Sequence, residues 1–401
     1  MPDRLSELTE RAKAAVDKPA ALGPDIDLAQ FAPTGSGKTE LSDEDAANLL
    51  LAGVDLSGKG RGGSFVMSDD HVVSCSANIE GVELIPVTEA LERYEWAREL
   101  YWGLVPVDMD KYTAAAHLDL HDGYFIRALP GAKVTMPLQT CLYITTEGLR
   151  QHVHNIMIAE EGSELHIISG CATAPHLTRG LHIGISEFYV RKGATLSFTM
   201  IHKWAPDVAV RPRSAARVEE GGLFLSNYIT LNPVKDLQSY PTVHLEGPEA
   251  VARLYSIIRG HPGNQIDLGG RVYLRHPGCR AEIVSRAITG GARITARGHL
   301  VGTSPGIKAH LECRGLILGG GALLAIPELE GHTEGVEMSH EAAVGKIAQE
   351  EIFYLMSRGL SEEEATSTIV RGFLTIDIPE LPAPLKAEMD RAIEATDTHA
   401  M

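Results

Sequence analysis

The sequence lacks the features that mark nucleic-acid-binding, membrane-bound or secreted proteins. Its 36 Lys and Arg are outnumbered by 53 Asp and Glu, so the formal net charge of −17 provides no general attraction to phosphate backbones or anionic lipids. No apolar run reaches the length of about 18 residues that a membrane-spanning helix needs, and the charged start, Met1–Glu7, has no apolar segment of the signal-peptide kind. We therefore expect a soluble, cytoplasmic protein with neither nucleic acid nor membrane among its partners.

Cysteine is also scarce, and its spacing excludes two common uses. The chain has five cysteines, an odd number, and no two of them form a C-x-x-C motif. They are Cys75, Cys141, Cys171, Cys279 and Cys313. A disulfide scaffold or a zinc knuckle is therefore not expected. Any metal site must be assembled from residues distant in sequence or from two chains.

Glycine, in contrast, is abundant and regularly placed. Aromatic residues make up only 5% of the chain, whereas 40 residues are glycine, which favours many tight turns over a large aromatic core. A glycine followed three residues later by an apolar-x-apolar pattern recurs at Gly131, Gly162, Gly193, Gly278 and Gly306. With a weaker copy at Gly221 and a further glycine at Gly247, the step is roughly 25 to 31 residues, which is typical of stacked repeats.

Each copy alternates apolar and polar residues, which predicts a short strand with one buried face. No helical pattern of about ten or more residues lies between the copies. We therefore expect a mainly β fold, a β-solenoid in which each coil covers the hydrophobic face of its neighbour; a jelly roll is the structural alternative. The expected division is an N-terminal helical or irregular region at 1–110, the β core at 111–334 and a C-terminal helical region at 335–401.

The two ends of the chain carry helical patterns. Residues 4–17 and 87–104 have helical spacing, whereas 20–70 is rich in proline, glycine and aspartate. After Gly335 the apolar spacing returns to a period of about 3.6 residues and predicts two amphipathic helices. The second of these begins with a capping box formed by Ser361 and Glu364.

The strand alternation also predicts the direction of two thiols. Cys313 has the parity of Leu311, and Cys171 has the parity of Ile167. Both thiols are therefore expected on the apolar face of their strands. Each is either a functional group or simply a small buried hydrophobic side chain.

One set of side chains near the C-terminus points to metal chemistry. Cys313, His340 and Glu341 place a thiol, an imidazole and a carboxylate within 29 residues. Thiolate is a soft ligand and the other two are harder. The set therefore suits iron, zinc or an iron–sulfur unit better than magnesium or calcium.

The segment Ala32–Thr39, Ala-Pro-Thr-Gly-Ser-Gly-Lys-Thr, resembles a Walker A loop with alanine in place of the first glycine. Such a loop needs a buried strand directly before it, but Asp25–Phe31 is short and acidic, and no apolar strand ending in aspartate is evident as a Walker B motif. We interpret the segment as a flexible glycine-rich linker and expect this chain to bind no nucleotide. A nucleotide hydrolase that uses Lys38 is the less favoured alternative.

Histidines alternate in two short motifs, His117-x-Asp119-x-His121 and His152-x-His154. On strands, each motif would direct its side chains to one face, where they could bind a metal as in barrel-type metalloenzymes. Because the chain has 17 histidines, chance pairs are expected, and we favour a solvent-exposed strand face. A β-helix or cupin-like metal-binding enzyme that uses these histidines is the alternative function.

Several longer motifs form a recognisable set. They are Glu312–Gly319, Ser339–Ala342 with Gly345–Ile347, Ile352–Leu355, Ser357–Ala365 and Ile369–Phe373, together with His154, Glu161–Gly162 and Gly170–Pro175 upstream. This set resembles the SufB/SufD family of iron–sulfur cluster assembly scaffold proteins, whose upstream segment ends in Gly-Cys-Thr-Ala-Pro. The resemblance covers residues 115–380 closely and the first hundred loosely.

The resemblance implies a right-handed parallel β-helix flanked by helical regions, in agreement with the repeat. It also implies that two chains associate through the β-helix and that the C-terminal helices bind a separate ABC-type ATPase, SufC, here through residues 349–373. The chain itself is then a scaffold and not an enzyme. It is expected to pass its cluster to recipient apo iron–sulfur proteins.

The resemblance also implies roles for individual residues. Cys313 and Glu341 match family positions that hold a nascent iron–sulfur cluster, expected to be of the 4Fe–4S type, and His340 matches a histidine contributed across the dimer. Cys171 matches a thiol that accepts sulfur. Trp204 resembles a residue that lines the sulfur route between the two cysteines.

Glu341 beside His340 makes the chain similar to SufB, since SufD usually has glycine at that position. The chain is shorter than typical bacterial SufB and lacks its N-terminal cysteine cluster, as in the compact SufB-like scaffolds of archaeal and minimal systems. A homodimer is therefore expected. Its two-fold axis would bring together Cys313, His340 and Glu341 of both chains.

Overall fold

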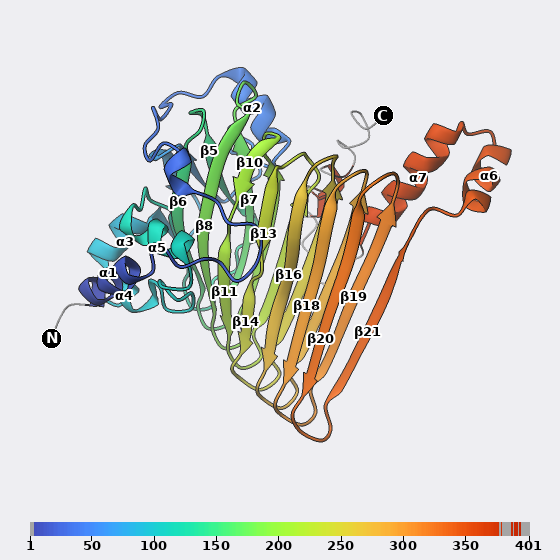
Figure 1. Ribbon diagram of the computed structural model, residues 1–401. Helices are drawn as coiled ribbons and strands as arrows, with labels where there is room; N and C mark the ends of the chain where they lie inside the picture. The colour runs from blue at the N-terminus through green and yellow to red at the C-terminus, as the bar shows by residue number, and fades with distance from the viewer. Residues whose placement is uncertain (1–3, 377, 379–385, 388, 392, 394–401) are drawn as a thin grey trace.

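The chain folds into a parallel β-helix of about eight turns with helices at both ends (Figure 1). The structure is a computed structural model that describes residues 4–376, 378, 386–387, 389–391 and 393. Strands account for 45% of the described residues and helices for 18%, which confirms the mainly β prediction. The jelly-roll alternative, which requires antiparallel strands, is wrong because successive coils pair in parallel.

Two sheets form the walls of the β-helix (Figure 1). The first contains, in spatial order, β2 (His71–Ala77), β1 (Gly63–Ser68), β5 (Leu138–Ile144), β7 (Glu164–Thr173), β9 (Thr195–Lys203), β12 (Leu223–Thr230), β15 (Val251–Gly260), β17 (Arg280–Thr289), β19 (Lys308–Ile317) and β21 (Glu337–Gly345). The second contains β3 (Val82–Pro86), β4 (Tyr124–Ala128), β6 (Arg150–Ala159), β8 (Arg179–Val190), β11 (Arg213–Val218), β14 (Thr242–Leu245), β16 (Gln265–Leu274), β18 (Arg293–Gly302) and β20 (Ala322–Gly331). The short strands β10 (Asp207–Val210) and β13 (Asp236–Ser239) lie between β8 and β16.

Each coil lies over the next in parallel register. Glu164 pairs with Thr195, and Arg280 pairs with Lys308, which are steps of 31 and 28 residues. These steps confirm the repeat predicted from the glycines. Gly162 has a positive φ of 67°, and no atom lies within 4 Å of the position that a Cβ would take. Glycine is therefore needed there for its backbone conformation and not for lack of space.

The N-terminal helices cover the outer face of the second sheet near its first strands. They are α1 (Arg4–Ala14), α3 (Val87–Arg93), α4 (Ala97–Leu100) and α5 (Lys111–Leu118), and the segment before β1 holds η1 (Leu28–Gln30) and α2 (Asp43–Leu50). Leu8 and Tyr112 belong to the same hydrophobic cluster as Phe125 of β4 and Ile183 of β8. The helix predicted at 4–17 is confirmed, whereas 87–104 holds two short helices in place of one.

The C-terminal region differs from the prediction at its start. Residues 337–345, expected to begin a helical region, form β21 and pair with β19, because they alternate in polarity and complete a further coil. The sheets thus run beyond residue 334, and they begin at Gly63, before residue 110. The two predicted helices follow as α6 (Gln349–Ser357) and α7 (Glu362–Leu374), and the capping box of Ser361 with Glu364 is confirmed.

The β-helix is open at its C-terminal end. β20 pairs with β18 and β21 pairs with β19, so within the described residues each last strand has one edge without a neighbour. Such edges are ready to pair with another chain. Apolar side chains are also exposed here, with Leu324 at 56% and Val344 at 43%.

The last helices extend from this open end (Figure 1). Val370 and Leu374 of α7 belong to the same hydrophobic cluster as Ile257 of β15, which anchors the end of α7 on the first sheet. α6 is farther out and exposes Phe353 and Tyr354, each at 58%. The part of the predicted C-terminal region at residues 379–385 and 394–401 lies outside the described residues.

Candidate functional site

Cys313 lies inside the β-helix, one strand from its open end. It is on β19, only 2% exposed, in the same interior cluster as Leu311, which confirms the predicted parity. Burial raises the pKa of the Cys313 thiol to about 11, and the neighbouring carboxylate of Glu312 acts in the same direction. The thiol is therefore protonated at neutral pH until a cation or an opposite charge approaches.

His340 and Glu341 lie on β21, the last strand of the first sheet. Its register with β19 pairs Leu311 with His340 and Cys313 with Ala342. Since side chains alternate along a strand, His340 shares the face of Cys313, and Glu341 is on the opposite face. Both side chains are exposed. A single chain therefore brings His340 and Cys313 to one face but does not bring Glu341 to it.

Glu341 instead joins a polar group on the outer face. His310, Glu312 and Glu341 each offer a ligand atom, and these atoms lie within 4.8 Å of one another. Arg314 contacts both carboxylates, at 3.1 Å from Glu312 and 3.0 Å from Glu341, and Arg286 also bonds Glu312. In the absence of a metal ion, these two arginines neutralise the negative charge of the Glu312 and Glu341 carboxylates.

The sequence-based reasoning missed His310 and Glu312. The signal was present in the alternation that placed Cys313, since His310-x-Glu312 precedes it on the same strand with the opposite parity. What the sequence did not show was that Glu341 lies beside Glu312 in the next coil. Because the two coils are adjacent, His310, Glu312 and Glu341 form a group that could hold a metal ion.

Cys171 is the second buried thiol of the interior. It lies on β7, fully buried, in the same cluster as Ile167, as its parity predicted. Burial raises the pKa of its thiol to about 12. Five strand-to-strand steps separate β7 from β19 in the first sheet, which is roughly 24 Å at about 4.8 Å per step. The two thiols therefore do not react directly with each other.

Two small cavities lie in the interior between these cysteines. The first, of about 40 Å³, is lined in part by His182, His202 and Tyr228, and the second, of about 50 Å³, by Tyr228 and Ser285. Ser285 pairs with Cys313 in the sheet. The two cavities share Tyr228 and other lining residues. The interior between the two cysteines is therefore loosely packed and lined in part by polar side chains.

Trp204 lies beside the first cavity. Its ring centroid is 5.0 Å from that of His182 and 5.4 Å from that of His202. Burial lowers the pKa of His182 to about 3 and lowers that of His202 well below its usual range, so both imidazoles are neutral. The indole thus forms part of the aromatic and imidazole wall near β8 and β9.

The two histidine motifs are divided between different contacts. His117 is in helix α5 and not on a strand, so the predicted alternation at 117–121 is wrong. His152 and His154 are on β6 as predicted but are fully buried, so a solvent-exposed face is also wrong. The reason is that the N-terminal helices cover this face of the sheet.

The buried imidazole of His154 has a carboxylate partner. Its Nε2 lies 2.8 Å from Oε2 of Glu187 on β8, which is fully buried. The same carboxylate accepts hydrogen bonds from the backbone N–H groups of Trp102 and Val105. This arrangement joins the N-terminal region to the second sheet around the fully buried side chains of His154 and Glu187.

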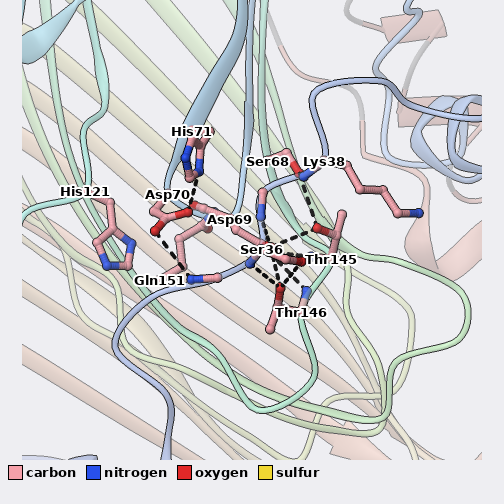
Figure 2. A network of polar contacts seen from close by, with 12 residues as sticks. Ser36, Lys38, Ser68, Asp69, Asp70, His71, His121, Thr145, Thr146 and Gln151 are labelled. Carbon is pink, nitrogen blue, oxygen red and sulfur yellow. Dashed lines mark hydrogen bonds and ion pairs between the residues drawn. The ribbon is translucent and has the colours of Figure 1, made fainter.

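The Walker-like segment is held by the chain's own polar groups (Figure 2). The backbone N–H groups of Ser36, Gly37 and Lys38 donate to Thr146, Asp69 and Ser68, in that order. Lys38 Nζ lies 3.3 Å from Oδ2 of Asp45, so the positive charge of the lysine is paired with this carboxylate. The amides that would bind a phosphate are thus occupied, and the segment is fixed, in contrast to the flexible linker we expected.

The fold and its open end define the class to which the chain belongs. It is a β-helix protein with a buried thiol one strand from an open edge and with imidazole and carboxylate groups on the edge strand. None of the described helices is long and apolar enough to cross a membrane.

Comparison with known proteins identifies the family. Residues 142–373 match the model of the SUF system FeS cluster assembly SufBD core domain. SufBD family proteins of Archaeoglobus fulgidus and Methanothermobacter thermautotrophicus are 50% and 45% identical to the chain, over 88% and 97% of its length and 95% and 98% of theirs. SufB of Bacillus subtilis is 32% identical over 81% of this chain and 70% of its own. The chain belongs to the SufBD family of iron–sulfur cluster assembly proteins.

Replacement of Asp69 tests the structural interpretation of the Walker-like segment. Asp69→Ala leaves the backbone N–H groups of Gly37, Thr145 and Thr146 without their acceptor. Each buried donor left unsatisfied costs about 1–3 kcal/mol. We expect the free energy of unfolding in denaturant titrations to fall by about 3 kcal/mol, with faster proteolysis at 33–39.

Lys38→Ala is the control, since it removes only a partly exposed ion pair, worth about 0–1 kcal/mol. Calorimetric titration with ATP should show no binding to either wild type or Lys38→Ala. Saturable ATP binding that disappears in Lys38→Ala would restore the nucleotide hydrolase alternative.

Proposed function

We propose that the chain is the scaffold on which a nascent iron–sulfur cluster is assembled at the open end of the β-helix. The observation that carries this proposal is the position of Cys313, buried one strand from the exposed edge strand that bears His340 and Glu341. The cluster is cargo and not a resident cofactor. The chain itself performs no conventional turnover, and the ATPase activity belongs to a separate SufC-type partner.

The ligand set is completed by a second copy of the chain. Within one chain, strand parity directs Glu341 away from Cys313. A two-fold axis at the open end would bring both copies of β21 together and so present the carboxylate of one chain to the thiol of the other. The unpaired strand edges and the exposed Leu324 and Val344 support association at this end.

His310 and Glu312 extend the proposed ligand set. Together with Glu341 they form a polar group on the outer face, opposite to Cys313, so like Glu341 they would reach the cluster from the second copy of the chain. Imidazole and carboxylate are harder ligands than thiolate and suit iron before sulfide is added. A cluster with few thiolate ligands is held less firmly than a Cys-only cluster, which favours its transfer to recipient apo proteins. The cluster is proposed to be of the 4Fe–4S type.

Cys171 is proposed to accept sulfur and to pass it toward Cys313 inside the β-helix. The interior cavities lined by His202, Tyr228 and Ser285 lie between the two cysteines and support this route. Trp204 would form part of its wall. Because the pKa of the Cys171 thiol is raised to about 12, the thiol needs an opening of the interior or a base before it can react.

Residues 349–373 are proposed to bind the SufC-type ATPase. Phe353 and Tyr354 are exposed on α6, where they could insert into a partner surface. The end of α7 packs against strands of the first sheet, among them β17, which is the neighbour of β19. A movement of the helices on ATP binding could therefore reach the strand that carries Cys313.

Cluster formation on Cys313→Ser tests the central proposal. The full chain and its ATPase partner are reconstituted anaerobically with ferrous iron and sulfide, and visible absorption and Mössbauer spectra are recorded. We expect wild type to form a cluster and Cys313→Ser to lose most of it, because serine is a poor ligand for iron in such a cluster. Cys279→Ser is the matched control, since Cys279 is also buried but lies in a turn between coils. Equal cluster content in Cys313→Ser and wild type would contradict the assignment.

Substitution on the last strand tests the dimer. Val344→Glu places a charge on the open edge and should convert the dimer to a monomer in light-scattering measurements of mass. Leu118→Glu on α5 is the control. Leu118 is similarly exposed, at 41% against 43% for Val344, but it belongs to the N-terminal helices and not to the open end. Persistence of the dimer in Val344→Glu would place the interface elsewhere.

Substitution on α6 tests the docking surface. Phe353→Ala should weaken binding of the ATPase partner about tenfold or more in calorimetric titrations, as is usual for an exposed aromatic anchor. Met109→Ala, an exposed side chain of the N-terminal region, should leave the affinity unchanged. Wild-type affinity of Phe353→Ala would exclude this face of α6 from the contact.

A further inference from the structure

Parts of the two histidine motifs meet at a second group of potential metal ligands. Asp119 and His121 follow helix α5, and His152 lies on β6. Each offers one ligand atom, and the three atoms lie within 4.8 Å of one another. Ligands around a tetrahedral zinc ion are about 3.3 Å apart, so small side-chain rotations would close the set. Asp119 and His121 are half-buried, whereas His152 is fully buried, so the group opens to solvent on one side.

His121 is oriented as a metal-binding imidazole would be. Its Nε2 lies 2.7 Å from the carbonyl oxygen of Pro33, so this nitrogen carries the proton and donates it. Nδ1 therefore has the lone pair, and it is directed toward the backbone N–H of His152 at a long 3.4 Å. Metal-binding histidines commonly donate their second N–H to a backbone carbonyl in this way. Figure 2 shows His121 together with residues of the neighbouring 36–38 segment.

The side chain of His152 is incompletely satisfied in its present surroundings. Nδ1 lies 3.0 Å from the carbonyl oxygen of Asp119 and 3.6 Å from its Oδ2, and Nε2 is buried without a partner among the described residues. A neutral imidazole has one proton and one lone pair. If Nδ1 has the lone pair, it faces two oxygens of Asp119, and a cation between them would relieve the repulsion. The rings of His121 and His152 are stacked, with centroids 5.4 Å apart.

We propose that Asp119, His121 and His152 bind a divalent transition-metal ion of the zinc or ferrous iron class. Two imidazoles and one carboxylate are a common donor set for these ions, and three protein ligands leave at least one position open. The site is independent of the cluster site. β6 lies near the covered end of the second sheet, whereas Cys313 lies near the open end of the first.

Arg150 is the main competitor for this cation. Its Nη2 lies 3.2 Å from Oδ2 of Asp119, so a metal ion must share or displace this contact. Two positive charges on one carboxylate oppose each other. The affinity for the metal is therefore restrained in the wild type and should rise when the arginine is removed.

Metal titration of the full chain tests the proposal. Cys313→Ser combined with His310→Gln and Glu341→Gln serves as the parent protein, so that iron or zinc at Cys313 or at the group of His310, Glu312 and Glu341 does not contribute. After removal of metal with a chelator, Zn²⁺ is added aerobically and Fe²⁺ anaerobically, and binding is followed by calorimetry and by metal analysis after desalting. Co²⁺ is used as a third probe, because its visible absorption spectrum depends on the ligands that surround it. We expect one ion per chain for at least one of Zn²⁺ and Fe²⁺.

Three further variants are added to the parent protein. His121→Gln should weaken binding at least tenfold and change the Co²⁺ spectrum, and Arg150→Gln should tighten binding. His166→Gln is the control, because His166 is a partly buried strand histidine that bonds Ser197 and is not part of the group. Unchanged binding in His121→Gln, or no ion bound by the parent, would overturn the metal site. Neither result bears on cluster assembly, which is measured separately.

Discussion

The parallel backbone ladder that stacks one coil on the next is the interaction on which the rest of the structure depends. It places residues about 28 to 31 positions apart side by side, so that Ser285, Cys313 and Ala342 form one row across three strands. The same ladder stops at β20 and β21, which have one free edge each within the described residues. The end of the ladder is therefore both the place where a second chain can add and the place where the buried thiol comes closest to the surface.

The two ends of the β-helix differ, since the N-terminal helices cover the first and the strand edges of the second have no neighbour within the described residues. At the start, the buried carboxylate of Glu187 holds His154 and the backbone of the N-terminal segment against the second sheet. Removing a partner from such a buried charge costs several kcal/mol, so this end stays closed. The association and the cluster chemistry that we propose are both at the C-terminal end. The proposed metal ion would lie beside the closed end, where it would add to the contacts of the N-terminal segment.

Much of the fold could be predicted because its signals are local. The glycine step predicted the coils, and strand parity predicted that Cys313 and Cys171 point inward. The capping box at Ser361 marked the start of α7 within the sequence itself. The errors arose where a local pattern was ambiguous. Residues 337–345 formed a strand because a neighbouring strand was available, and His117 lies in a helix that packs on the sheet.

The candidate site could be predicted only in part. The sequence by itself determined which residues share a face of a strand, because alternation depends on the residue and its nearest neighbours alone. Only the tertiary structure decided that Glu341 lies beside Glu312 and faces away from Cys313, and that Asp119 and His121 meet His152. The physical reason is that contacts between coils depend on the number of residues in each turn and on what covers the outer face, and neither is encoded in a single short motif.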